Sequence, residues 1–229
     1  MSARDRIDID PPYDYPAYKS TRLRAPKQSL IRVGPHPLET AGPVFPKRFV
    51  KDAEADLTTF GKSAPLGEKM ILAGRVTDED GKPARRSLVE LWQCNASGRY
   101  AHPVDQHDAP LDPNFLGQGK VLTDDDGRYR FVTIKPGAYP WKNHPWAWRP
   151  AHIHLSLFGN AYSQRLITQV FFPGDPLLPI DPVFNSVTDE AARQRMVCEL
   201  DLERGIEEVA LGYRFDIVLR GANSTPMGV

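Results

Sequence analysis

This chain of 229 residues has little cysteine, no long apolar run and no excess of either charge. Its two cysteines, Cys94 and Cys198, are too few for a disulfide framework and lack C-x-x-C spacing, so we expect two reduced, buried thiols. No apolar run approaches the roughly 20 residues that a membrane-spanning helix needs. The 29 basic and 29 acidic side chains balance. Without a basic excess to bind phosphates, neither nucleic acid nor a membrane is an expected partner.

Two further absences narrow the class of protein. The first residues, Met1 to Asp8, are charged and lack the apolar centre of a signal peptide, so a cytoplasmic location is expected. The chain also lacks the glycine spacing of a phosphate loop and the Gly-x-Ser-x-Gly turn of many hydrolases. Proline, in contrast, is abundant: 22 residues, or roughly twice the usual share of ~5%. This composition predicts long ordered loops, which are common places for functional sites.

The composition divides the chain into an arm and a domain. Residues 1–65 are rich in Pro, Tyr and charge, and three tyrosines fall between Tyr13 and Tyr18. Such a segment cannot form a core alone, so it is either a disordered arm or an extended arm laid over a partner subunit. The tyrosines favour the second reading, because Tyr supplies contact area at interfaces. Residues 66–229 form the expected folded, catalytic domain.

The domain is predicted to be mainly β, with short strands separated by turns that contain Gly, Pro and Asp. This pattern predicts a β-sandwich with long loops. One helix is expected near 189–200, because Ser186 to Asp189 has the form of a capping box and good helix formers follow. The predicted strands cover residues 70–77, 87–93, 128–134, 151–158, 166–172 and 213–220.

The strand predicted at 151–158 carries two histidines, His152 and His154. Side chains two apart on a strand point to the same face, so both imidazoles can reach one metal ion while Ile153 points into a core. A His-x-His pair alone is a weak signal, because it is often a pair of satisfied polar groups or a zinc pair. Tyr139, 13 residues before His152, and Tyr100 add two candidate phenolate ligands.

The types of these residues bear on which metal they would hold. No cysteine lies near either histidine in sequence, which disfavours a thiolate zinc site, and the His-Glu-x-x-His pattern of zinc hydrolases is absent. Two tyrosine ligands must both ionise although an isolated Tyr has a pKa of about 10. A trivalent ion can drive that ionisation, and two phenolates with one hydroxide leave a neutral site around Fe³⁺. The charge count therefore favours ferric iron.

Several motifs together resemble the intradiol ring-cleaving dioxygenases. The resemblance extends from about Tyr18 to Gly221 and includes the spacing of all four ligand positions. The motifs are Asn95-Ala-Ser-Gly-Arg-Tyr100, Leu111-Asp-Pro-Asn-Phe115, Thr133-Ile-Lys-Pro-Gly137, Tyr139-Pro-Trp141, Trp148-Arg-Pro-Ala-His-Ile-His154, Leu166-Ile-Thr-Gln169, Phe172-Pro-Gly-Asp-Pro176 and Tyr213-Arg-Phe-Asp-Ile-Val-Leu-Arg-Gly221.

The resemblance implies a role for each matched residue. Arg149 would lie over the substrate ring and stabilise negative charge, Tyr139 would leave the metal when substrate binds, and Gln169 would lie near the oxygen pocket. The ring would be held between Trp141 and Val183, and Tyr18 of the arm would help to bind a ring carboxylate. The ferric ligands implied are Tyr100, Tyr139, His152 and His154.

The activity implied is cleavage of protocatechuate by O₂ to 3-carboxy-cis,cis-muconate. The chain would be the iron-bearing subunit of a hetero-oligomer, because the substrate carboxylate needs a cation that a homologous α subunit would supply. A homo-oligomeric catechol or hydroxyquinol dioxygenase, a metal-free transthyretin-like binding sandwich and a zinc hydrolase remain alternatives. Relatives of the first kind usually carry a longer helical N-terminal region, which is missing here.

A few residues near the motifs are expected to matter less. Ala138 replaces a proline that the family usually has before the ligand Tyr, and His107 occupies a position that is usually aromatic. His107 is expected to be a partly exposed loop residue, and His102 and His144 are expected on surface loops. Trp146 and Trp148, like Trp141, could be core residues.

Overall fold

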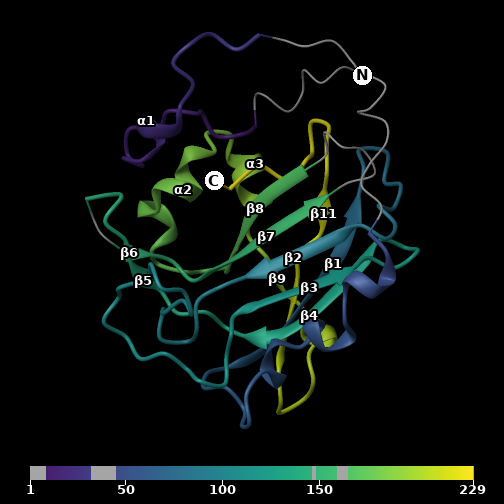
Figure 1. Cartoon of the computed structure of the whole chain (residues 1–229). Coiled ribbons are helices and arrows are strands. Elements are labelled where there is room, and N and C mark those ends of the chain that lie inside the picture. Colours follow the sequence, from purple (N-terminus) through teal and green to yellow (C-terminus); the bar gives the residue numbers. More distant parts are fainter. Residues whose placement is uncertain (1–8, 32–44, 146–147, 159–164, 229) are drawn as a thin grey trace.

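Two β-sheets packed face to face form the body of the protein, as the computed structural model shows (Figure 1). The structure describes residues 9–31, 45–145, 148–158 and 165–228. In the first sheet, β1 (Lys69–Thr77) pairs with β4 on one side and with β10 and β11 on the other, and β9 pairs with β10. The second sheet has the order β3-β2-β7-β8. The predicted mainly β sandwich is therefore confirmed.

The remaining elements are short. Strands β5 (Tyr139–Pro140) and β6 (Trp148–Arg149) form a small separate ribbon. The other strands are β2 (Leu88–Trp92), β3 (Gln118–Leu122), β4 (Arg128–Ile134), β7 (His152–Phe158), β8 (Arg165–Phe171), β9 (Glu199–Leu200), β10 (Leu211–Arg214) and β11 (Ile217–Val218). The helices are α1 (Thr21–Arg24), α2 (Pro182–Ser186) and α3 (Glu190–Gln194), with 3₁₀ turns η2 (Lys47–Phe49), η3 (Asp52–Ala55), η4 (Leu57–Thr59), η5 (Leu178–Ile180) and η6 (Leu202–Arg204).

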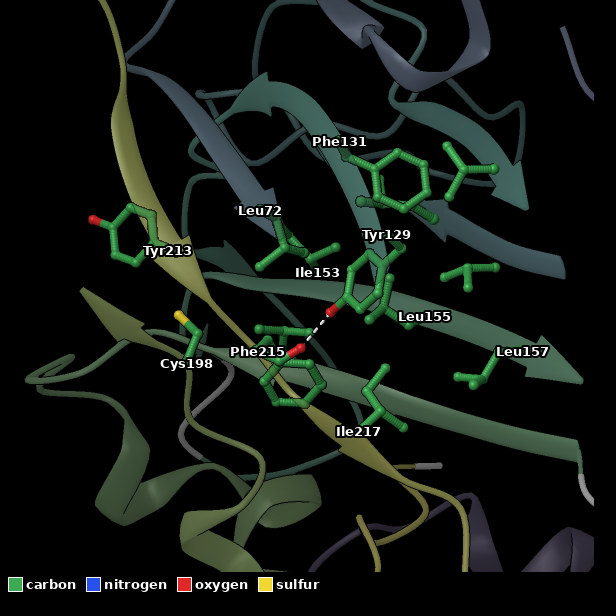
Figure 2. Packing of buried hydrophobic residues seen from close by; sticks show 14 of the residues in the cluster. Leu72, Tyr129, Phe131, Ile153, Leu155, Leu157, Cys198, Tyr213, Phe215 and Ile217 are labelled. Atoms are coloured by element: carbon green, nitrogen blue, oxygen red, sulfur yellow. Dashed lines mark hydrogen bonds between the residues drawn. The ribbon is translucent and has the colours of Figure 1, made fainter. Parts of the chain in front are cut away.

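The main core lies between the two sheets (Figure 2). Leu72 and Phe131 come from the first sheet, and Ile153, Leu155 and Leu157 come from β7 of the second. Because side chains alternate along a strand, burial of the odd-numbered residues of β7 turns His152 and His154 to the opposite face. Ile153 is fully buried, as predicted. The candidate site therefore lies on the outer face of the second sheet.

The helix predicted at 189–200 exists but is shorter. Helix α3 ends at Gln194, and its N-cap is Asp189, which accepts from the Ala192 backbone N–H at 2.6 Å. The chain then pairs with the edge of β8, since Phe171 N donates to Met196 O and Cys198 N donates to Phe171 O. Pairing with an open strand edge thus prevails over the helix propensity of this segment. Helix α2, which begins at Pro182, was not predicted.

The strand predicted at 213–220 is divided into β10 and β11. Between them the Phe215 carbonyl lies so close to Gly74 of β1 that a β-carbon there would stand 1.9 Å from it. Phe215 N still donates to Ala73 O at 2.9 Å, and Tyr129 Oη donates to Phe215 O at 2.6 Å (Figure 2). The glycine allows this close approach, and its role could not be read from the strand pattern. Strand β3 was also missed by the sequence analysis.

The second half of the expected arm packs on the sandwich. Leu57 is buried in the main core, and Asp56 forms an isolated bridge with Val132 of β4. In the first half, Lys19 N donates to Asn143 O, and Asp10 accepts from Met227 N. Among the residues that the structure describes, no helix is long and apolar enough to cross a membrane.

Candidate metal centre

Strand pairing places the candidate residues in a row across the outer face of the second sheet. Trp92 of β2 lies opposite His154 of β7, and His154 lies opposite Gln169 of β8. The rings of Trp92 and His154 stack with centroids 4.8 Å apart and planes within 4° of parallel. The rings of His152 and His154 lie 4.9 Å apart. The same-face prediction for the two histidines is confirmed, and Gln169 joins them through register alone.

A loop that carries Tyr100 and the short strand β5, which begins at Tyr139, bring both tyrosines over this row. The Tyr100 and Tyr139 rings meet edge to face at 5.5 Å, and the Tyr139 hydroxyl lies 3.2 Å from His152 Nε2. The Tyr100 loop approaches the Tyr139 loop at Gly98, which has a φ of 78° and no space for a side chain, because a β-carbon would stand 2.3 Å from Ala138 O. The glycine in Asn95-Ala-Ser-Gly-Arg-Tyr100 is thus needed both for its backbone conformation and for this contact.

The tautomer of His152 is fixed by the backbone. Its Nδ1 lies 2.7 Å from the carbonyl oxygen of Pro150, which can only accept a hydrogen bond, so Nδ1 carries the proton. Nε2 then presents its lone pair toward Tyr139 and Arg149. A histidine that donates through one ring nitrogen and offers the other is the usual arrangement of a metal ligand.

Burial sets the protonation of the four residues. It lowers the pKa of His154 to about 3 and, together with the Arg149 charge, lowers the pKa of His152 well below its ordinary value. Both imidazoles are therefore neutral near pH 7 and able to bind a metal. Burial raises the pKa of Tyr139 and raises that of Tyr100 still further, because the two phenols lie side by side. The protein alone thus keeps both phenols protonated, and ionising them requires a nearby cation.

Arg149 lies behind the histidines and is almost fully buried. Asp181 accepts two hydrogen bonds from it, from Nε and Nη2, each at 2.9 Å. Gln169 Oε1 accepts a third from Nη2 at 2.7 Å, and Nη1 lies 3.0 Å from His152 Nε2. The Arg149 guanidinium also lies over the Trp141 ring, 5.1 Å from its centroid. The guanidinium is thus fixed at the edge of the four candidate ligands.

These residues fit a bound metal ion by three observations. The His152 Nε2 lone pair faces the Tyr139 hydroxyl, and the buried Tyr100 hydroxyl finds no hydrogen-bond partner within the described ranges. A buried polar atom without a partner is costly unless something else binds it. No group of three or more His, Cys, Asp and Glu side chains that could hold a metal occurs in the described part of the chain. An ion bound by the two histidines would therefore take its remaining protein ligands from the tyrosines.

The arm and helix α2 carry two further predicted residues, Tyr18 and Val183. The Tyr18 ring packs edge to face on Trp141 at 4.7 Å. Val183 is buried on α2, two residues after Asp181. A cavity of about 340 Å³ lies between the arm and this segment, and Lys19, His144 and Asp181 are among its lining residues.

Some expectations for neighbouring residues were wrong, and two residues were missed. His144 is 3% exposed rather than on the surface, and its Nε2 lies 3.0 Å from Trp148 O, whereas Trp148 is 46% exposed and not a core residue. His102 is exposed and His107 is partly exposed, as predicted. Trp146 lies outside the described residues.

The two missed residues are Asp181 and Arg24. Asp181 precedes Pro182, and a helix N-cap before proline was its available signal. Arg24 places its guanidinium over the Tyr18 ring at 4.8 Å, and no sequence motif indicates this contact.

Comparison with known proteins identifies the family. A model described as "Dioxygenase" matches residues 40–221, and a model described as "Protocatechuate 3,4-dioxygenase beta subunit N terminal" matches residues 2–36. The chain is 54% identical over 219 residues to the protocatechuate 3,4-dioxygenase beta chain of Burkholderia cepacia, covering 95% of this chain and 93% of that one. The chain belongs to the intradiol dioxygenase family. It is an enzyme of a family that is generally iron-dependent.

Two further relatives place it within the intradiol dioxygenases. It is 28% identical over 201 residues to the protocatechuate 3,4-dioxygenase alpha chain of Pseudomonas putida, covering 82% of this chain and 93% of that one. The solved structure of a catechol 1,2-dioxygenase from Pseudomonas arvilla superposes with a TM-score of 0.54 at 26% identity, covering 74% of this chain and 57% of that one. The family resemblance drawn from the motifs and the sandwich fold predicted from the strand pattern are therefore both confirmed.

Proposed function

We propose that this intradiol dioxygenase cleaves protocatechuate with O₂ to give 3-carboxy-cis,cis-muconate. The bond that breaks joins the two hydroxylated ring carbons, and both oxygen atoms of O₂ enter the product. The similarity to a protocatechuate 3,4-dioxygenase beta chain over almost the whole of both chains supports this substrate over catechol or hydroxyquinol. The single observation in the structure that carries the proposal is the convergence of two neutral imidazoles and two buried phenols beside one fixed guanidinium.

The metal we propose is ferric iron, held by Tyr100, Tyr139, His152 and His154. When bound, it would supply Lewis-acid activation of the catechol and hold the substrate oxygens in place. The two histidines contribute neutral lone pairs, and the tyrosines contribute the negative charge that a trivalent ion requires. Tyr139 is the ligand that gives way to substrate in this proposal. Its phenol is stable in the neutral form, because burial raises its pKa.

Arg149 is the proposed catalytic cation. Its Nη1 faces the Tyr139 and His152 side, where negative charge spreads over the substrate ring during the reaction. In a buried site a fixed cation stabilises such charge more than it would in water, and no solvent has to reorganise. Gln169, which holds Arg149 Nη2, is the second polar group proposed to act at the oxygen side of the pocket.

Trp141, Val183 and Tyr18 are proposed to select the substrate. Trp141 and Val183 would hold the two faces of the ring, and the Tyr18 hydroxyl would bind the carboxylate. Arg24, which stacks on Tyr18, brings a cation of this chain near that end of the pocket. We propose in addition a homologous α subunit that completes the binding of the carboxylate and contacts residues 1–65. The names of the beta-chain and alpha-chain relatives support such an assembly.

A visible absorption spectrum tests the proposed metal and substrate together. The purified protein, with its partner chain, should show a broad phenolate-to-iron charge-transfer band that shifts on anaerobic addition of protocatechuate. Admission of O₂ should then yield carboxymuconate. A colourless protein after iron reconstitution would contradict the tyrosine ligands, and faster turnover of catechol than of protocatechuate would contradict the substrate.

A further inference from the structure

The hydrogen bonds of Arg149 are divided into two groups with different directions. A guanidinium has five N–H bonds in one plane. Asp181 accepts one from Nε and one from Nη2, and Gln169 accepts the other from Nη2. The two N–H bonds of Nη1 are left, and this nitrogen is the one that faces His152. Three donors thus anchor the side chain, and two are directed at the site.

Asp181, which binds Arg149 through both carboxylate oxygens, is itself completely buried. Its exposure is 0% and that of Arg149 is 2%, so the ion pair is shielded from water. The two parallel hydrogen bonds allow only one in-plane orientation of the guanidinium, which a single contact would not. A buried charge is tolerated only when it is paired and hydrogen-bonded, and here each charge supplies the partner of the other.

The same carboxylate also fixes the start of helix α2. Asp181 Oδ2 accepts from the Phe184 backbone N–H at 3.0 Å as the N-cap of this helix. Val183 lies within this first turn and is buried. One side chain therefore sets the positions of two residues that the proposed function places against the substrate ring, Arg149 and Val183.

We infer that Asp181 is the positioning residue of the active site, holding Arg149 so that only its Nη1 edge meets the substrate. This inference rests on the proposed function, in which Arg149 stabilises charge on the ring. Asp181 itself does not touch the substrate. Its loss should therefore lower kcat more than it raises KM, because the Arg149 contact matters most in the transition state.

The first test uses kinetics of the iron-loaded enzyme with its partner chain. Asp181→Asn keeps an oxygen for the Phe184 N–H but removes the charge and one acceptor. We expect kcat per bound iron to fall about 100-fold, as for a small displacement of a catalytic group, with iron content unchanged. In an Arg149→Gln background the same change should have little further effect on kcat. Independent, multiplicative losses in the double variant would overturn the inference.

The matched control is Asp189→Asn, which alters the N-cap of the neighbouring helix α3. Asp189 caps through the Ala192 N–H, but it makes no contact with Arg149. It should change stability slightly and leave kcat intact. If Asp181→Asn fails to fold, Asp181→Glu keeps the charge while moving it by one methylene, and it should still lower kcat. Wild-type kcat in Asp181→Glu would also overturn the inference.

The second test needs neither iron nor turnover. In ¹⁵N-labelled protein the Arg149 Nε–H resonance should exchange slowly with water, because it is buried and bonded to Asp181. Asp181→Asn should accelerate this exchange at least tenfold, and Asp189→Asn should not. Equal exchange in both variants would refute the positioning role. Failure of the wild-type enzyme to cleave protocatechuate, with the exchange difference present, would instead refute only the proposed function.

Discussion

The two sides of the candidate site differ in how their polar groups are satisfied. Behind the histidines, the anchoring donors of Arg149 meet Asp181 and Gln169, and Gln169 Nε2 in turn donates to Gly228 O at 2.6 Å. In front, the Tyr100 hydroxyl is buried without a partner in the described structure, whereas the His152 Nε2 lone pair faces the Tyr139 hydroxyl at 3.2 Å and Arg149 Nη1 at 3.0 Å. A fully bonded cluster is a support, whereas buried polar atoms with bonding capacity to spare mark the place for a ligand.

Removing one of the proposed metal ligands should have the largest effect on iron binding and turnover. His154→Ala should abolish iron binding and turnover together, a greater loss than the ~10–100-fold caused by losing an outer partner of a metal ligand. The fold should survive, since the stacking on Trp92 contributes about 1 kcal/mol. Iron per chain and the thermal midpoint measure the two effects. His102→Ala, at an exposed histidine, is the control, and stoichiometric iron in His154→Ala would remove His154 from the ligand set.

Removing the cation from the back should separate chemistry from metal binding. Arg149→Gln should retain iron, lower kcat by roughly 100-fold and destabilise the protein by about 3–5 kcal/mol, because Asp181 is left as a buried, unpaired charge. Arg214→Gln is the control, since Arg214 forms its ion pairs at the exposed surface, where such pairs contribute about 1 kcal/mol or less. Denaturant unfolding and steady-state kinetics give both quantities. Unchanged kinetics would exclude Arg149 from the mechanism.

The two tyrosines should respond differently although both are proposed ligands. In protein without iron, Tyr100→Phe removes a buried hydroxyl that has no partner, so the free energy of unfolding should stay constant or rise by about 1 kcal/mol. Tyr139→Phe removes the contact with His152 Nε2 and should lower it by about 1 kcal/mol. Both should weaken iron binding and change the visible band. A stability loss in Tyr100→Phe equal to that of Tyr139→Phe would show that the Tyr100 hydroxyl is satisfied.

The sequence predicted the proposed metal ligands better than it predicted the residues that hold Arg149 behind them. His152 and His154 share a face because of strand periodicity, which is local, and the motifs around Tyr100 and Tyr139 are specific enough to identify the family. Asp181 was missed because nothing within its own segment indicates a partner 32 residues away. Long-range pairing of this kind depends on how α2 packs in the folded chain, where Phe184 lies against Phe171 of β8.

The fold shows the same division between local and distant causes. Five predicted strands match β1, β2, β4, β7 and β8 to within one residue at each end, because alternation is visible within each segment. The length of α3 could not be predicted, since its end is set by the edge of β8. The break between β10 and β11 likewise depends on Gly74, 141 residues before Phe215 in the chain.

Displacing Gly228 should weaken the support of Gln169, which accepts a hydrogen bond from Arg149, and so lower kcat moderately. Gly228 packs so closely on β8 that a β-carbon would stand 2.6 Å from Gln169 N. Gly228→Ala should therefore move the Gly228 carbonyl away from Gln169 Nε2 and lower kcat by about tenfold, less than direct loss of Arg149. Gly221→Ala is the control for a general loss of stability, because alanine there is strained at a φ of 87° and its β-carbon would meet Glu79, which is not a residue of the site. Equal kcat in Gly228→Ala and the wild type would show that Gln169 needs no support from the chain terminus.

The last prediction concerns Cys94, which lies beside the segment that carries Tyr139 and takes no part in catalysis. Its Sγ is 3.3 Å from Gly137 O, next to the Tyr139 loop, and burial raises its pKa to about 12. Cys198, in the sandwich core, has its pKa raised to about 12 for the same reason. With so little thiolate at pH 8, both should react with iodoacetamide about 1,000-fold more slowly than a free cysteine. Mass spectrometry of native and urea-unfolded protein measures this. Cys94 is shielded by its contact with Gly137, close to Tyr139. Rapid labelling of Cys94 alone would therefore show that the segment carrying Tyr139 opens, and the geometry of the proposed ligands would then not be preformed.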